Sequence, residues 1–95
     1  MENQKVIIRG EKSGVYFGTL KNKKGKEVTL TNVCNIWRWA GACSILQLAK
    51  EGTKNPSECK FTVVVEELVI TDCIEIIPCT EESILSIENV PIWKI

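Results

Sequence analysis

The residues whose types and spacing best suit a binding site lie in the stretch N-I-W-R-W-A-G-A-C-S at positions 35–44. If positions 35–40 form a regular strand, Trp37 and Trp39 share one face, because side chains alternate across a strand. Two indole rings on one face make a platform on which a base or a partner's planar side chain stacks. Arg38 adds a group suited to bidentate phosphate contact, although it faces the other way in a regular strand.

A turn and the start of a helix follow this platform directly. Free amides at a helix N-terminus attract phosphate and other anions, so a stacking surface beside such a site is the arrangement that a nucleotide needs. The sequence therefore predicts ligand contacts at seven positions. They are Trp37, Arg38, Trp39, Gly41, Ala42, Ser44 and Gln47.

A packing role accounts for the same stretch. Trp37 and Trp39 can be the core anchors of a small domain that has few other large aromatic residues. The small Gly41 and Ala42 then allow a helix to pack closely against a strand. The two interpretations do not exclude each other, because one tryptophan can pack while the other lines a pocket.

No catalytic motif is visible in the chain. It contains no histidine, which is the commonest general base, and five cysteines that form no C-x-x-C pair. Glu66 and Glu67 are adjacent, so in a strand they point to opposite faces and cannot act as a pair. Without histidine, neither an activated thiol nor a zinc site is expected. We therefore expect a binding protein, not an enzyme, with no metal and no cofactor.

The balance of charges argues against a nucleic acid as the main partner. Twelve Lys and Arg residues are cancelled by twelve Asp and Glu residues, whereas binding to a nucleic-acid backbone needs a basic excess. The lysines at positions 21–26 fit a solvated hairpin tip. The odd cysteine count, the absence of a signal peptide and the absence of any run long enough to span a membrane predict a cytoplasmic protein.

The length of the chain and its hydrophobic pattern limit the possible folds. Ninety-five residues suffice for one domain over 1–95, and strongly apolar segments leave more strand edge than one small core covers, which predicts a homo-oligomer. We expect an α+β, mainly β fold, either a small bent antiparallel sheet or an SH3-like or Sm-like barrel, with two short helices. Strands are predicted at 5–9, 15–20, 27–32, 35–40, 61–77 in two or three pieces broken near Glu66 and Asp72, and 91–95 at an edge.

The two helices have end signals in the sequence. The first ends at Gly52 and begins either near Ala42, with Gly41 as its cap, or at Ser44, which makes a capping box with Gln47. The second begins after Thr80 and runs to about Glu88, with acidic residues in its first turn.

Several pieces of the sequence resemble a family of short phage and prophage proteins classed as a domain of unknown function. The pieces include I-I-R-G-E-K-S-G-V-Y-F-G-T-L, I-W-R-W-A-G-A, N-P-S-E-C-K-F and V-P-I-W-K-I, and together with others they cover nearly the whole chain. The chain departs from the family pattern at Cys34, Asn35, Arg38 and Cys43, where a basic or aromatic residue, an Arg, a Tyr and an Ala are expected.

The resemblance implies a role in phage biology inside a host cell, without assigning an activity. Small phage proteins without catalytic residues are commonly virion parts, inhibitors of a host protein, or sponges that sequester a nucleotide signal of host immunity. An aromatic platform beside a helix N-terminus in a self-associating protein resembles a sponge most. We therefore expect a nucleotide-derived small molecule as ligand, with a virion component or a protein inhibitor as the alternative.

Overall fold

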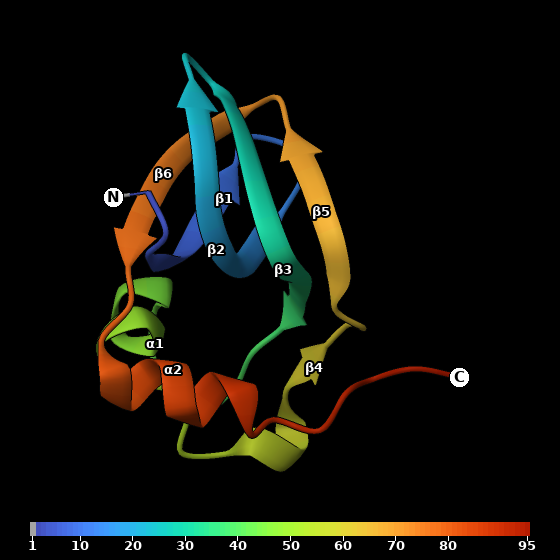
Figure 1. The fold of residues 1–95 in the computed structure, drawn as a ribbon. Helices are drawn as coiled ribbons and strands as arrows, with labels where there is room; N and C mark the ends of the chain where they lie inside the picture. The colour runs from blue at the N-terminus through green and yellow to red at the C-terminus, as the bar shows by residue number, and fades with distance from the viewer. Residues whose placement is uncertain (1) are drawn as a thin grey trace.

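The computed structural model describes residues 2–95, whose strands form one curled antiparallel sheet with two α-helices beneath it (Figure 1). The α-helices are α1 (Ile45–Glu51) and α2 (Glu81–Glu88), and a 3-10 turn, η1, spans Pro56–Glu58. The strands are β1 (Lys5–Gly10), β2 (Val15–Lys24), β3 (Glu27–Arg38), β4 (Lys60–Phe61), β5 (Val65–Ile70) and β6 (Cys73–Pro78). No helix in this span has both the length and the apolar composition needed to cross a membrane.

The strand order explains why the sheet curls. The order runs β6-β1-β2-β3, and the far edge of β3 pairs first with β5 and then, near its end, with β4. β5 and β6 therefore belong to opposite edges of the sheet, yet only Thr71 and Asp72 separate them in the chain. Figure 1 shows the two strands on opposite sides and joined across one end. The expected bent sheet with two short helices is confirmed, and the sheet is open because β5 and β6 do not pair.

Asp72 holds the corner between β5 and β6. Its carboxylate accepts hydrogen bonds from the Lys12 amide at 2.7 Å, the Ser13 amide at 3.0 Å and the Ser13 hydroxyl at 2.6 Å. Stabilisation of the charged form by these donors lowers the pKa of Asp72. The corner is thus fastened to the loop between β1 and β2.

Both faces of the sheet are covered, and each has its own core. Inside the curl lie Val6, Ile8, Leu20, Val28, Leu30, Val33, Ile70 and Cys73. Between the sheet and the helices lie Ile7, Phe17, Cys34, Ile36, Leu48, Ala49, Cys59, Phe61, Ile87 and Val90. Val6, Ile7 and Ile8 are all fully buried because alternate residues of β1 enter the two cores.

The predicted hairpin is present, but its second arm does not stop at position 32. β3 continues to Arg38, so the segments expected as separate strands at 27–32 and 35–40 form one strand. Between the pairs Thr19↔Thr31 and Phe17↔Cys34, β2 has one residue and β3 has two. This is a β-bulge, and Asn32 adopts φ +47° within it. The bulge shifts the alternation, so Leu30 enters the inner core and Cys34 the outer one.

The remaining helix and strand boundaries agree with the sequence prediction where a capping residue marks them. Thr80 caps α2, which ends at Glu88, and Ser44 caps α1, so the shorter of the two predicted first helices is the correct one. The apolar block breaks at Asp72 as predicted, but its other break falls at 62–64 and not near Glu66. The predicted edge strand at 91–95 is wrong: only Ile92 bridges, to Phe61, because β4 is two residues long and offers little edge.

Candidate functional site

Trp37 and Trp39 lie in different environments. The Trp37 side chain is 60% exposed, whereas Trp39 is half-buried and packs against the core between the sheet and the helices. The pairing of β3 with β4 shifts register between Ile36 and Arg38, and β3 ends at Arg38. The alternation of a regular strand therefore does not extend to Trp39, and the two rings do not form one exposed platform.

The aromatic partner of Trp37 is Trp93. The two ring centroids are 5.0 Å apart with an interplanar angle of 32°, and Trp93 is 43% exposed. The Lys60 ammonium lies 5.6 Å from the Trp37 centroid and 5.2 Å from the Trp93 centroid, within cation–π range of both rings. Arg38 is the cross-strand partner of Lys60. We call Trp37, Arg38, Lys60 and Trp93 the aromatic surface.

β4 positions this surface although it contains only two residues. Lys60 extends over the tryptophans, and the next residue, Phe61, is buried in the core, because successive side chains leave a strand on opposite sides. The C-terminal segment is held beside β4 by the Ile92 bridge and by a hydrogen bond of 2.9 Å from the Trp93 amide to the Phe61 carbonyl. Two short segments, distant in sequence from Trp37, thus place the other aromatic ring and the cation beside it.

Gly41 has a structural role in this arrangement. Its φ is +77°, and a Cβ at this position would overlap the backbone nitrogens of Lys54 and Asn55. The Lys54 amide donates to the Gly41 carbonyl at 3.1 Å, and the Thr53 hydroxyl donates to the Ala40 carbonyl at 2.5 Å. Ala42 packs against the core. The close neighbour of Gly41 is therefore the loop at 53–55, whereas the sequence suggested a helix.

Ser44 caps α1, and the polar groups of Ser44 and Gln47 form hydrogen bonds with neighbouring residues of the chain. The Gln47 amide donates to Ser44 Oγ at 3.1 Å, and the Cys43 amide donates to Gln47 Oε1 at 2.7 Å. The Gln47 side-chain amide donates to Glu51 at 3.2 Å. These bonds occupy donors that an anion would need, and α1 is only seven residues long. The structure thus separates the seven predicted residues, with Trp37 and Arg38 on the aromatic surface and the other five in local packing and capping.

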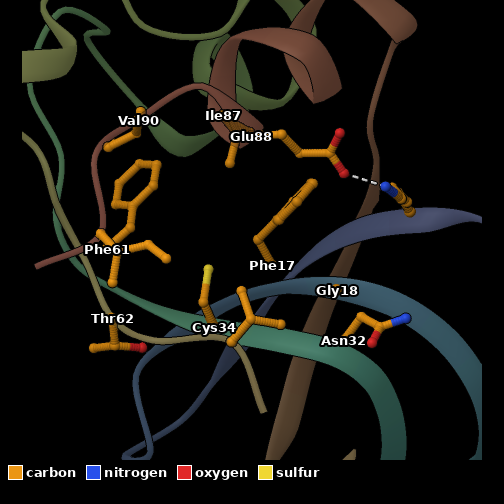
Figure 2. A pocket seen from close by; sticks show the side chains of 12 residues that line it. Phe17, Gly18, Asn32, Cys34, Phe61, Thr62, Ile87, Glu88 and Val90 are labelled. Carbon is orange, nitrogen blue, oxygen red and sulfur yellow. Dashed lines mark hydrogen bonds and ion pairs between the residues drawn. The ribbon is translucent and has the colours of Figure 1, made fainter. Parts of the chain in front are cut away.

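A pocket of about 210 Å³ lies on the other side of β4, between the outer face of the sheet and the end of α2 (Figure 2). Phe17, Cys34, Phe61, Ile87 and Val90 make its apolar interior, and an ion pair between Lys5 and Glu88 lies at its rim. Val64 and Ile92 complete the wall beside β4. None of the seven predicted ligand residues lines this pocket.

Cys34 lines the pocket, and Cys79 packs against the same core. Burial raises the pKa of Cys34 to about 11 and that of Cys79 to about 11. Among residues 2–95, no three His, Cys, Asp or Glu side chains gather closely enough to hold a metal ion.

Sequence reasoning missed Lys60 and Trp93 as parts of the site. A tryptophan in the terminal P-I-W-K-I segment was visible, and so was a lysine directly before an apolar block. Neither signal says which residue Trp93 faces, because its contact with Trp37 depends on the long-range pairing of the two segments around β4.

The comparisons with known proteins identify a family. The chain belongs to a family described as a domain of unknown function (DUF6948), whose model matches residues 3–87. The match includes Trp37, Arg38 and Lys60 and ends before Trp93. Searches of curated proteins and of solved structures found no match.

Proposed function

We propose that this member of the DUF6948 family is a binding protein that holds a nucleotide-type ligand on its aromatic surface and releases it unchanged. The observation that carries the proposal is the exposed pair of Trp37 and Trp93 with the Lys60 ammonium within reach of both rings. A stacked aromatic pair next to cations offers the two contacts that a nucleotide makes, one to its base and one to its phosphate.

Exposure of both rings supports a binding role. Large aromatic side chains contribute most to stability when buried, and an exposed apolar cluster rimmed by polar groups marks an interaction site. The two rings are tilted by 32° and keep 60% and 43% of their side-chain surface exposed, for Trp37 and Trp93 respectively. A base stacked on such a face is worth about 1–3 kcal/mol.

The cations of the surface are available to an anion. Within residues 2–95, Arg38 and Lys60 enter no ion pair, whereas Lys5, Arg9 and Lys21 each have a carboxylate partner. Arg38 offers a planar fork that suits phosphate oxygens, and Lys60 adds a compact charge. Together they favour an anionic ligand over a neutral one.

Binding without turnover agrees with the chemistry of the side chains. Partial or full burial raises the pKa of Cys34 and that of Cys79 to about 11, so these thiols carry almost no thiolate at neutral pH. The aromatic surface itself contains no histidine, carboxylate or thiol, which are common general bases and nucleophiles. Given the resemblance to phage proteins, we propose sequestration of a nucleotide signal of host immunity as the biological role.

A protein partner is the second candidate. Tryptophan and arginine are enriched among the residues that dominate protein interfaces, and the aromatic surface is open, whereas small-molecule sites are usually concave. In that case the chain would be a virion component or an inhibitor of a host protein.

A thermal-shift screen of cyclic dinucleotides, cyclic trinucleotides and ADP-ribose derivatives separates the two candidates. A nucleotide ligand raises the melting temperature by mass action, and heat denaturation of the complex should return it intact. Trp37→Ala should weaken its binding by about 10- to 100-fold, the equivalent of one lost stacking contact. Leu46→Ala is the matched control, because Leu46 is also 60% exposed but lies on α1.

The outcomes are distinct. A cleaved product would contradict binding without turnover. If no nucleotide shifts the melting temperature, or if the Trp37→Ala and Trp93→Ala variants both bind it with unchanged affinity, the aromatic surface is not a nucleotide site.

A further inference from the structure

The apolar surface beside the pocket has no cover within residues 2–95. Val63, Val64, Val65 and Ile92 are each between 43% and 55% exposed, and Ile95 is fully exposed. Val64 and Ile92 line the same pocket, so the two segments meet there. We call these five residues the valine–tail surface. Single exposed apolar side chains are ordinary, but Val64 and Ile92 meet at the rim of an apolar pocket, and exposed apolar side chains gathered in this way mark an interaction site.

From this surface we infer that the protein is a twofold homodimer, in which Ile95 of each copy enters the pocket of the other. The inference goes beyond the proposed ligand site, because it concerns the pocket and its rim, which no residue of the aromatic surface lines. A twofold interface uses the same patch on both copies, so the patch must contain both a projecting group and a recess to receive it. The valine–tail surface has both.

The recess has the size and lining for one aliphatic side chain. Its volume is about 210 Å³, and its interior is formed by Phe17, Cys34, Phe61, Ile87 and Val90. A cavity of about 150 Å³ with a similar apolar lining is large enough for benzene, and drug-sized ligands occupy about 300–1,000 Å³. The pocket therefore fits a single anchor side chain better than a whole nucleotide.

The projecting group is the C-terminal segment. In Figure 1 this segment runs away from the body of the molecule after the end of α2. Ile92 forms part of the pocket wall, and Ile95 lies three residues further on, at most about 10 Å away in an extended chain. Ile95 is fully exposed and does not line its own pocket, and this reach suffices to cross an interface that lies against the pocket wall.

Two charged residues that adjoin the valine–tail surface in the sequence favour a second copy as the occupant. Lys94 lies in the C-terminal segment, and Glu66 directly follows Val65. Within residues 2–95 neither side chain has an ion-pair partner, although Glu67 is paired with Lys21. A twofold axis through the valines sets Lys94 of one copy against Glu66 of the partner subunit, and repeats the contact in reverse. A patch that carries one basic and one acidic residue is complementary to itself when a twofold axis brings the opposite charges together.

Light scattering coupled to gel filtration of the full chain, over a range of micromolar concentrations, tests the dimer. The wild type should be a dimer, and Val64→Glu should raise the dimer dissociation constant by about 100-fold or more, because it buries an unpaired carboxylate. Leu46→Glu introduces the same charge at an exposed apolar position on α1 and should leave the dimer intact.

Charge exchange tests the register of the interface even if Val64→Glu fails to fold. Glu66→Lys and Lys94→Glu alone should each weaken the dimer by about 3- to 10-fold, and the double variant should recover most of the loss. In a mixed dimer of labelled and unlabelled chains, isotope-filtered NOE spectra should connect the Ile95 methyl groups to Phe61 or Ile87 of the partner subunit.

Three results would overturn the inference: a monomer throughout the concentration range, a ring of three or more copies, or a dimer that both Val64→Glu and Ile95→Asp leave unchanged. Nucleotide binding is a separate measurement. A monomer that binds a nucleotide removes only the dimer, and a dimer that binds none removes only the proposed function.

Discussion

Trp37 and Trp39 are two residues apart, but they belong to regions that are stabilised in different ways. Around Trp39 the chain is fixed by close packing and by hydrogen bonds between the backbone at Ala40 and Gly41 and the loop at 53–55. Trp37 is exposed, and its ring contacts the exposed ring of Trp93 and the Lys60 ammonium. We therefore expect the region around Trp39 to determine the stability of the protein and the region around Trp37 to determine ligand binding. Two tryptophans in a similar sequence context thus have different roles.

The largest effect expected in the packed region comes from Gly41→Ala. A Cβ at Gly41 would overlap backbone nitrogens of the facing loop, and φ of +77° is unfavourable for alanine. We expect a loss of about 3 kcal/mol or more in the free energy of unfolding. Urea denaturation followed by circular dichroism measures it. Gly25→Ala is the control, because Gly25 also has positive φ, at +62°, but a Cβ there meets open space. Equal losses in the two variants would show that packing at Gly41 contributes nothing.

Trp39→Ala should have the next largest effect. Removing the ring opens a cavity next to the core, and we expect a loss of about 2–3 kcal/mol, somewhat below the cost for a fully buried ring because Trp39 is half-buried. Affinity for a nucleotide, measured well below the melting temperature, should stay close to that of the wild type. A variant of wild-type stability that has lost ligand affinity would reverse the roles given to the two tryptophans.

Trp37→Ala should cost at most about 1 kcal/mol of stability, because it removes one exposed aromatic pair and one cation–π contact. The same urea titration measures this loss beside that of Trp39→Ala. If Trp37→Ala destabilises the protein as much as Trp39→Ala does, the aromatic surface is a packing feature and the contrast between the two regions disappears.

The smallest effect at neutral pH should come from Asp72→Asn, which lies in neither region. The donors around Asp72 lower its pKa below the usual 3.8, so its stabilising effect is complete above that value and is lost as the pH falls through the lowered pKa. The wild type should therefore be more stable than Asp72→Asn at pH 7, and the two should converge in strong acid. Glu58→Gln serves as the control, since Glu58 is exposed and forms no ion pair within residues 2–95. A difference that persists in acid would mean that the aspartate charge is not its source.

Local signals predicted the elements whose stability is local. The hairpin around Gly25, the end of the first helix at Gly52 and the helix from Thr80 to Glu88 depend on turn residues and caps within a few positions. The prediction of an edge strand at 91–95 was wrong for the opposite reason. An edge strand needs a neighbour of matching length, and the two-residue length of β4 is not visible in the terminal segment itself.

For the candidate site, the sequence alone identified a tryptophan- and arginine-rich stretch without a catalytic motif, and it left open whether Trp37 and Trp39 are packed or line a pocket. The tertiary structure decided the rest. The register shift between Ile36 and Arg38 and the end of β3 at Arg38 break the alternation that would have placed Trp39 beside Trp37. The ring that does lie beside Trp37 comes from the far end of the chain. Side-chain direction in a strand follows from local geometry only while the pairing is regular, and the partner of an exposed ring is set by which distant segments the fold brings together.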